Sequence, residues 1–169
     1  MELALNKRNR TLASYLVRSL PASDRKLARL WIKLHRKPAQ LRGYQTRLLK
    51  NPHIMAPKIL ASVTKRLASR NPQQAIEFLF KAGMSNTIAQ EDHFDVLQTL
   101  AMSLSRKHLP GAEFWFSHIP DQYLSDVGRE WRVRTALRES QWQTTLTALN
   151  GLSPEQTASD RWTFWRART

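Results

Sequence analysis

The chain has 169 residues, 41% of them hydrophobic, so it can bury a core, yet it contains no run of about 18 apolar residues that could span a membrane. It has no cysteine, which excludes disulfides, thiol nucleophiles and cysteine-ligated metals. The formal net charge is +14, and residues 1–76 hold 17 Lys and Arg against two acidic residues, whereas residues 77–169 are nearly neutral. The basic half forms a solvated exterior or attracts anions such as nucleic acid, anionic lipid or a cell-wall polymer bearing peptide carboxylates.

The N-terminal half shows apolar residues at helical spacing, and the segments end before prolines. A proline lacks an N–H group and clashes with the preceding turn, so it ends a helix. The first eight residues lack the apolar region and cleavage site of a signal peptide. The expected stripes are Leu12, Ala13, Leu16, Val17 and Leu20; then Leu27, Leu30, Trp31 and Leu34; then a short helix from Leu41 to Leu49; then Ile59, Leu60, Val63 and Leu67.

The C-terminal half continues in the same way. Ser125 and Asp126 are expected to accept the free N–H groups at the start of one helix. The same order, a proline followed by Ser-Asp, occurs after Pro21 and after Pro154. The expected segments are Ala75, Ile76, Leu79 and Phe80 with Gly83 as a C-cap; an acidic start at Glu91, Asp92 and Asp95 followed by Phe94, Leu97, Leu100, Ala101 and Leu104; Ala112, Trp115, Phe116 and Ile119; Ser125 to Arg138; Trp142 to Leu152; and a last proline-led segment carrying Trp162 and Trp165.

The absence of β-alternation and of an Asn-Gly hairpin signal predicts an all-α fold of about ten short helices. Pro38 and Pro72 are 34 residues apart, as are Pro120 and Pro154. A period of this length is typical of stacked helical hairpins, although the 48 residues between Pro72 and Pro120 make the repeat irregular. The sequence therefore predicts a curved α-solenoid in which each hairpin buries its apolar face against its neighbours.

Few residues carry recognisable chemistry. The five histidines do not fall in a zinc-binding pattern, and His93 is expected to be a histidine at a helix start rather than a ligand. There is no Gly-rich phosphate loop and no Gly-x-Ser-x-Gly elbow. The six tryptophans are expected to pack between hairpins rather than to contact a ligand. We therefore predict no catalytic, cofactor-binding or metal-binding residue, and no cofactor.

One ordered set of motifs resembles a known family. Glu130-Trp-Arg-Val-Arg-Thr-Ala-Leu137 is followed by Trp142, Leu149, Leu152-Ser-Pro154 and Arg161-Trp162-x-x-Trp165. In this order, these motifs resemble the superhelical domain of the soluble lytic murein transglycosylases. Upstream, Leu3-Ala-Leu-Asn6 to Leu20-Pro21 and Asn71-Pro72 to Phe80 resemble earlier repeats of that domain, so the resemblance covers nearly the whole chain.

The resemblance implies that residues 1–169 are part of one right-handed superhelical domain, U- or ring-shaped, from a periplasmic enzyme that degrades peptidoglycan. In that family a separate C-terminal lysozyme-like domain cleaves the glycan with one acidic residue, without metal or cofactor, while the superhelix embraces or guides the strand. The expected partners are peptidoglycan glycan strands and that lysozyme-like domain.

The chain departs from the family pattern in its catalytic motifs. The Gly-Leu-Met-Gln and Ala-Tyr-Asn-Ala-Gly segments of the catalytic domain do not occur. We therefore expect the chain to be inactive alone. Because it also begins and ends inside repeat units of the family pattern, we expect a segment that is truncated at both ends. Glu139-Ser140-Gln141-Trp142 resembles the surroundings of the family's catalytic acid, but Glu139 falls between two repeat helices and is expected to be a turn residue.

Two other classes of function remain open. A helical-repeat module of the tetratricopeptide type would bind a protein segment, although the irregular spacing disfavours it. A nucleic-acid-binding protein would use the basic half, although the cations are scattered around the helices without an evident recognition helix.

Overall fold

The computed structural model describes residues 1–7, 9–80 and 84–169, and these residues form helices joined by short turns, with no β-strand among them. The predicted all-α class is confirmed. The chain divides into two compact units, unit 1 (Met1–His93) and unit 2 (Phe94–Thr169). That both belong to one superhelical domain stays a prediction.

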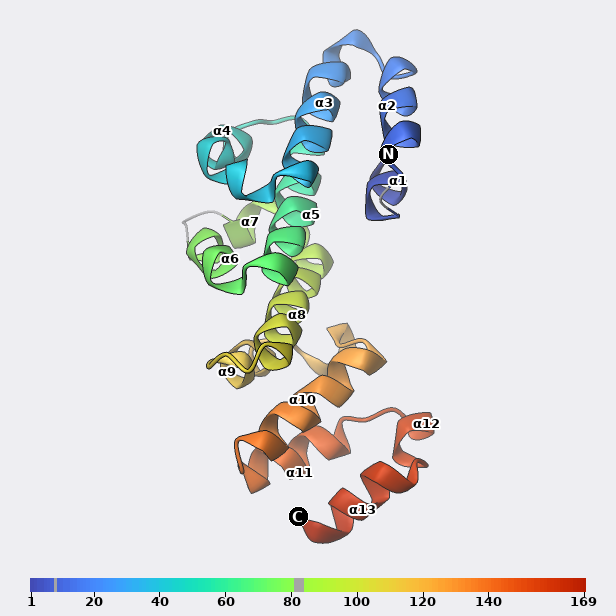
Figure 1. Cartoon of the computed structure of the whole chain (residues 1–169), viewed down its shortest axis with the longest axis vertical. Coiled ribbons are helices and arrows are strands. Elements are labelled where there is room, and N and C mark those ends of the chain that lie inside the picture. Colours follow the sequence, from blue (N-terminus) through green and yellow to red (C-terminus); the bar gives the residue numbers. More distant parts are fainter. Residues whose placement is uncertain (8, 81–83) are drawn as a thin grey trace. The chain divides into compact units, whose positions relative to one another are not determined.

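In unit 1 each helix packs mainly on helices close to it in the chain. Helices α1 and α2 pack together, α2 packs on α3, and α3, η1, α4 and α6 all contact α5. Figure 1 shows α5 with α4 and α6 beside it. The elements in chain order are α1 (Glu2–Asn6), α2 (Arg10–Arg18), α3 (Ala22–Arg36), the 3₁₀ helix η1 (Pro38–Gly43), α4 (Gln45–Leu49), α5 (Met55–Arg70), α6 (Pro72–Leu79) and α7 (Met84–Thr87), followed by the start of α8 (Gln90–Arg106).

Helix α5 forms the core of unit 1 because apolar or small residues lie on most of its circumference. Ile59, Leu60, Val63 and Leu67, the predicted stripe, are all buried. Ala56, Ala61 and Ala68 are buried as well, and these small side chains allow close approach of neighbouring helices. A helix with so wide an apolar face must be covered by several other helices, as α5 is.

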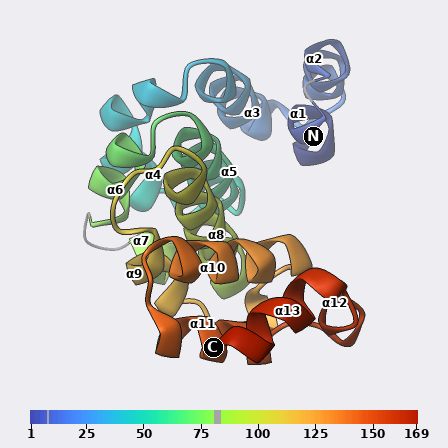
Figure 2. The same cartoon turned by 60° about the horizontal axis from the view of Figure 1, so that its bottom comes forward.

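Unit 2 repeats the pattern of neighbour-on-neighbour packing (Figure 2). Helix α10 contacts α9 and α11, and α13 contacts α11 and α12. Val133 of α10 packs with Leu149 of α11 and Trp162 of α13 in one buried cluster. After α8, the elements are α9 (Ala112–Ser117), η2 (Asp121–Tyr123), α10 (Asp126–Arg138), α11 (Trp142–Asn150), α12 (Pro154–Thr157) and α13 (Asp160–Arg168).

The start of α10 is held against α8 by a buried amide. The side chain of Ser125 accepts a hydrogen bond from the Gly128 N–H at 3.1 Å, which confirms the predicted N-cap. The Gln98 Oε1 atom accepts from both the N–H and the hydroxyl of Ser125, at 2.8 and 3.0 Å. A Cβ atom on Gly128 would clash with the end of the Gln98 side chain, so a larger residue at this position would require Gln98 to move.

The other two predicted Ser-Asp starts differ from expectation. Ser23 and Asp24 lie inside α3, because the helix begins at Ala22 with Pro21 as its N-cap. Ser159 is the N-cap of α13, but its side chain accepts no capping hydrogen bond. Ser153 instead forms a capping box with Gln156 at the start of α12.

Several predicted boundaries and burials also differ. Leu12 is 44% exposed and Phe80 71% exposed. Leu12 lies away from the Ala13–Val17 face, which is the buried face of α2, and Phe80 lies beyond the last turn of α6. The helix expected from Leu41 to Leu49 is divided into η1 and α4, and α11 ends at Asn150 rather than Leu152. The C-cap predicted at Gly83 lies outside the described residues. No helix in the described ranges combines the length and apolar character needed to cross a membrane.

Candidate functional site

Unit 1 contains a cavity of about 400 Å³ between α3, α4 and the turn that leads into α5. We call it the α3–α4 cavity. It combines an apolar floor with two cationic side chains and several hydrogen-bonding groups, and this composition is typical of small-molecule sites. Its lining residues are Ser23, Lys26, Leu27, Leu30, Tyr44, Arg47, Leu48, Asn51 and His53.

The floor of the cavity follows from helix periodicity. Leu27 and Leu30 are three residues apart on α3 and therefore share a face, and both are half-buried. Leu48 of α4 is 1% exposed and completes the apolar surface. Lys26 and Arg47 also line the cavity, and both residues are exposed. The cavity therefore presents positive charge beside apolar surface.

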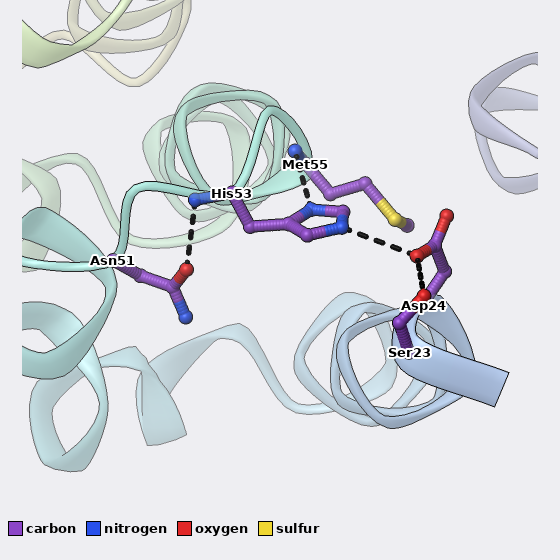
Figure 3. Close-up of polar contacts among 5 residues, drawn as sticks. All are labelled: Ser23, Asp24, Asn51, His53 and Met55. Carbon is purple, nitrogen blue, oxygen red and sulfur yellow. Dashed lines mark hydrogen bonds and ion pairs between the residues drawn. The ribbon is translucent and has the colours of Figure 1, made fainter.

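One wall is a turn that is fixed by hydrogen bonds (Figure 3). The Asn51 side chain accepts from the His53 N–H at 2.9 Å, and Pro52 between them stops α4 from continuing. The Met55 N–H, at the start of α5, donates to His53 Nδ1 at 3.2 Å. The imidazole thus satisfies a backbone N–H that the helix itself leaves free.

The orientation of His53 determines its proton. Because Nδ1 accepts from Met55, the neutral ring carries its hydrogen on Nε2. Nε2 lies 3.2 Å from Asp24 Oδ1 and donates to it. Figure 3 shows this pair linking α3 to the turn before α5. His53 therefore links the turn before α5 to α3, through a contact between residues that are 29 positions apart in the chain.

Ser23, Asp24 and His53 do not form a catalytic triad, although the residue types match. In a triad the histidine accepts the proton of the serine hydroxyl. Here the Ser23 hydroxyl donates to Asp24 Oδ1 at 2.6 Å, and both ring nitrogens of His53 are engaged elsewhere. No lone pair remains on the imidazole to act as a base. The arrangement supports positioning and binding, not nucleophilic catalysis.

Replacement of Ser23 by Ala is expected to raise the pKa of Asp24 towards its usual value of 3.8. The Ser23 hydroxyl bond is the main cause that holds this pKa down, and the contact with His53 adds to it. The pKa of Asp24 is lower in the folded protein than in the unfolded chain, so the ionised carboxylate stabilises the fold above pH 3.8. This stabilisation is lost as the pH falls through the pKa of Asp24 in the folded protein. Carbon-detected NMR titration of the Asp24 carboxyl measures the shift. Ser19→Ala is the matched control, and an unchanged Asp24 titration in Ser23→Ala would contradict the assignment.

Tyr44 is held in place by a neighbouring cation. Lys33 Nζ donates to the Tyr44 hydroxyl at 2.8 Å and lies 5.1 Å from the centre of the ring. The phenol proton stays available for donation, because the hydroxyl accepts from Lys33. Tyr44 therefore adds a wall with a polar tip to the cavity.

The structure places Glu139 in a turn, as predicted. It is the C-cap of α10, it is exposed, and its Oε2 accepts from the Gln141 side chain at 3.3 Å. Glu139 lines neither the α3–α4 cavity nor the smaller cavity between α2 and α3. Within residues 1–7, 9–80 and 84–169, no three histidine or acidic side chains gather as a metal site. That the chain has no catalytic residue stays a prediction.

The tryptophans serve mainly as packing residues. Trp31, Trp115 and Trp162 are buried, which confirms the expectation for these three. Trp142 is 50% exposed. Trp131 and Trp165 are half-buried, and the guanidinium groups of Arg106 and Arg134 lie near the Trp131 ring.

In unit 2, arginine and tryptophan side chains alternate across three helices, in a series that we call the Trp–Arg ladder. The guanidinium groups of Arg106 and Arg134 lie 5.0 and 5.2 Å from the Trp131 ring. Those of Arg134 and Arg161 lie 5.4 and 5.8 Å from the Trp162 ring. Glu130 pairs with Arg134 at 2.6 Å and fixes the shared cation. Each ring is thus contacted by two cations of the chain itself.

The α3–α4 cavity could not be predicted from the sequence. Locally, Asn51-Pro52 indicates only the end of a helix, and His53 is one of five histidines outside any zinc-binding pattern. The available signal was that polar residues follow Pro21 and Pro52 at positions where helices begin. Their meeting depends on how α3 packs beside α5, which local patterns do not encode.

Comparison with solved structures finds a similar fold. No protein-family model matches the chain, and no curated protein matches it. The fold is similar to the X-ray structure of an inactive mutant of the lytic transglycosylase Slt from Pseudomonas aeruginosa, with a TM-score of 0.85 and 25% sequence identity. The similarity covers 99% of this chain but 27% of that one. Over almost its whole length, the chain thus resembles a helical region that is about a quarter of the lytic transglycosylase Slt.

Proposed function

We propose that this chain is a non-catalytic superhelical segment of a lytic murein transglycosylase, and that it binds or guides the glycan strands of peptidoglycan. The observation that carries the proposal is the similarity to Slt over 99% of the chain at a TM-score of 0.85. The motifs from Glu130 to Trp165 support it independently, since they lie in the order found in that family.

The pattern of helix contacts supports the solenoid part of the proposal. In both units most of the helices that pack together lie close to each other along the chain. Such nearest-neighbour packing is the defining property of repeat arrays, in which hairpins stack and bury each other's apolar faces. The proposed array is a right-handed superhelix that is U- or ring-shaped in the complete protein.

Binding would be driven largely by charge. Residues 1–93 hold 18 Lys and Arg against five acidic residues, so unit 1 carries a formal charge of +13, whereas residues 94–169 carry +1. Peptidoglycan presents carboxylates along its peptides. A positive surface raises the local concentration of such a polymer and speeds its association.

Glycan cleavage in this proposal belongs to a lysozyme-like domain that accompanies the superhelix, and the site of action is the periplasm. A general acid needs a cleft and a raised pKa. Glu139 is exposed in a turn and lines neither described cavity. Glu139→Gln is therefore expected to leave binding unchanged.

The test is a pull-down of the purified chain with peptidoglycan sacculi. Retention is expected at about 50 mM salt and loss at about 500 mM, since screening shortens the range of surface electrostatics. The triple variant Arg29→Gln, Arg36→Gln, Lys37→Gln removes three exposed cations of unit 1 and should weaken retention several-fold, with Glu139→Gln as the control. No retention at low salt would overturn the proposal. Displacement by DNA at matched charge concentration would favour the nucleic-acid alternative, and retention of a protein partner with no affinity for sacculi would favour the tetratricopeptide-like one.

A further inference from the structure

We propose that the α3–α4 cavity is a binding site for the carboxylate end of a short, alanine-like peptide. The cavity belongs entirely to unit 1 and is lined by residues of α3, α4 and the turn before α5. The inference rests on the proposed function for the source of the peptide, because peptidoglycan carries peptide stems, but the chemistry of the cavity stands by itself.

The charged side chains that line the cavity favour an anionic ligand. Lys26 and Arg47 line the cavity, and no acidic side chain lines it. Among the described residues, neither cation forms an ion pair with an acidic side chain. Arginine matches a carboxylate with two parallel N–H bonds, and lysine adds a second positive charge. Asp24 lies nearby, but its carboxylate already accepts hydrogen bonds from Ser23 and His53.

The apolar floor selects an organic anion over a mineral one. Leu27, Leu30 and Leu48 offer surface that inorganic phosphate would leave uncovered. The methyl side chains of an alanine-like ligand, next to its carboxylate, would be buried against this apolar floor. A cavity of about 400 Å³ accommodates a ligand of dipeptide size.

The polar side chains of the cavity can donate hydrogen bonds to the carbonyl group of a peptide bond. The Asn51 side-chain oxygen is used by the His53 N–H, which leaves its NH₂ group to donate to a ligand carbonyl. The Tyr44 hydroxyl accepts from Lys33 and can donate its own proton. Because hydrogen bonds within the chain hold both walls, the cavity is preformed and little ordering is needed on binding.

The direct test is an NMR titration of the full chain, labelled with ¹⁵N, with the dipeptide alanyl-alanine. We expect saturable shifts at Ser23–Leu30 and Tyr44–His53, with a dissociation constant on the order of 1 mM. Alanyl-alaninamide lacks the carboxylate and should bind at least about tenfold more weakly. Inorganic phosphate tests whether charge alone suffices. If inorganic phosphate or alanyl-alaninamide bound as tightly as alanyl-alanine, the proposal would be overturned.

Matched variants locate the site. Arg47→Gln should weaken alanyl-alanine binding about tenfold, because one charge-assisted pair is lost. Arg18→Gln makes the same change at the smaller cavity between α2 and α3 and should leave binding unchanged. An unaltered spectrum elsewhere shows that each variant is folded. Equal affinity for both variants and the parent chain would place the peptide outside this cavity.

The two proposals fail separately. Sacculi retained at low salt without any dipeptide shift would remove the cavity assignment and leave the proposed function standing. Dipeptide shifts without retention of sacculi would remove the proposed function and leave a peptide-carboxylate site.

Discussion

Replacement of Trp31 by Ala is expected to lower the free energy of unfolding by about 3–5 kcal/mol, the range for truncating a large buried aromatic side chain. Trp31 is 3% exposed on α3, and its Nε1 donates to Ser62 Oγ on α5 at 2.6 Å. The truncation leaves a cavity between the two helices and an unpartnered hydroxyl. Guanidinium denaturation followed by far-UV circular dichroism measures the loss, and hydrogen exchange should locate it in α3 and α5.

Two controls separate packing from hydrogen bonding at this site. Ser62→Ala removes the hydrogen bond but keeps the ring, and should cost about 0.5–1.5 kcal/mol. Trp142→Ala removes a ring that is 50% exposed and should change stability by about 0.5 kcal/mol or less. If Trp31→Ala cost no more than Ser62→Ala, Trp31 would not be a packing anchor.

Replacement of Trp162 by Ala is expected to have a comparable effect in unit 2, also about 3–5 kcal/mol. Trp162 is 3% exposed, packs with Val133 and Leu149, and contacts the guanidinium groups of Arg134 and Arg161. Its loss removes the main buried side chain of α13, so this helix should detach from α11. Faster amide exchange throughout α13, together with a lower denaturation midpoint, is the expected result.

The matched control for Trp162 lies on the same helix. Phe164 is 55% exposed, so Phe164→Ala removes an aromatic ring with little buried area and should cost about 0.5 kcal/mol or less. Slow exchange of α13 amides in Trp162→Ala would show that other contacts hold the C-terminal helix, and would contradict the role of Trp162 in anchoring α13.

The starts and ends of the helices could largely be predicted from the sequence, because they depend on neighbouring residues. The apolar stripe of α5 is buried as expected, and Ser125 caps α10 as expected. Ser159 shows the limit of the same argument. It has the residue type of a cap, but it makes no capping side-chain bond, because a cap also requires a side-chain rotamer that residue type alone does not specify.

The burial of individual side chains was harder to predict at the outer helices. Leu12 belongs to an apolar stripe, yet it is 44% exposed because α2 packs through Ala13 and Val17. Periodicity shows that a face is apolar, whereas the position of the neighbouring helix decides how wide a part of that face is covered.

By itself, the sequence determined the all-α class, the approximate helix boundaries, and the concentration of positive charge in the first half, because helical period, proline and formal charge are local properties. Only the tertiary structure decided that Asp24 meets His53 and that Lys26 and Arg47 share a cavity with three leucines. The two halves of that cavity come from helices separated along the chain, and their meeting depends on how α3, α4 and α5 pack. Packing is a property of complementary surfaces, and no single segment contains both surfaces.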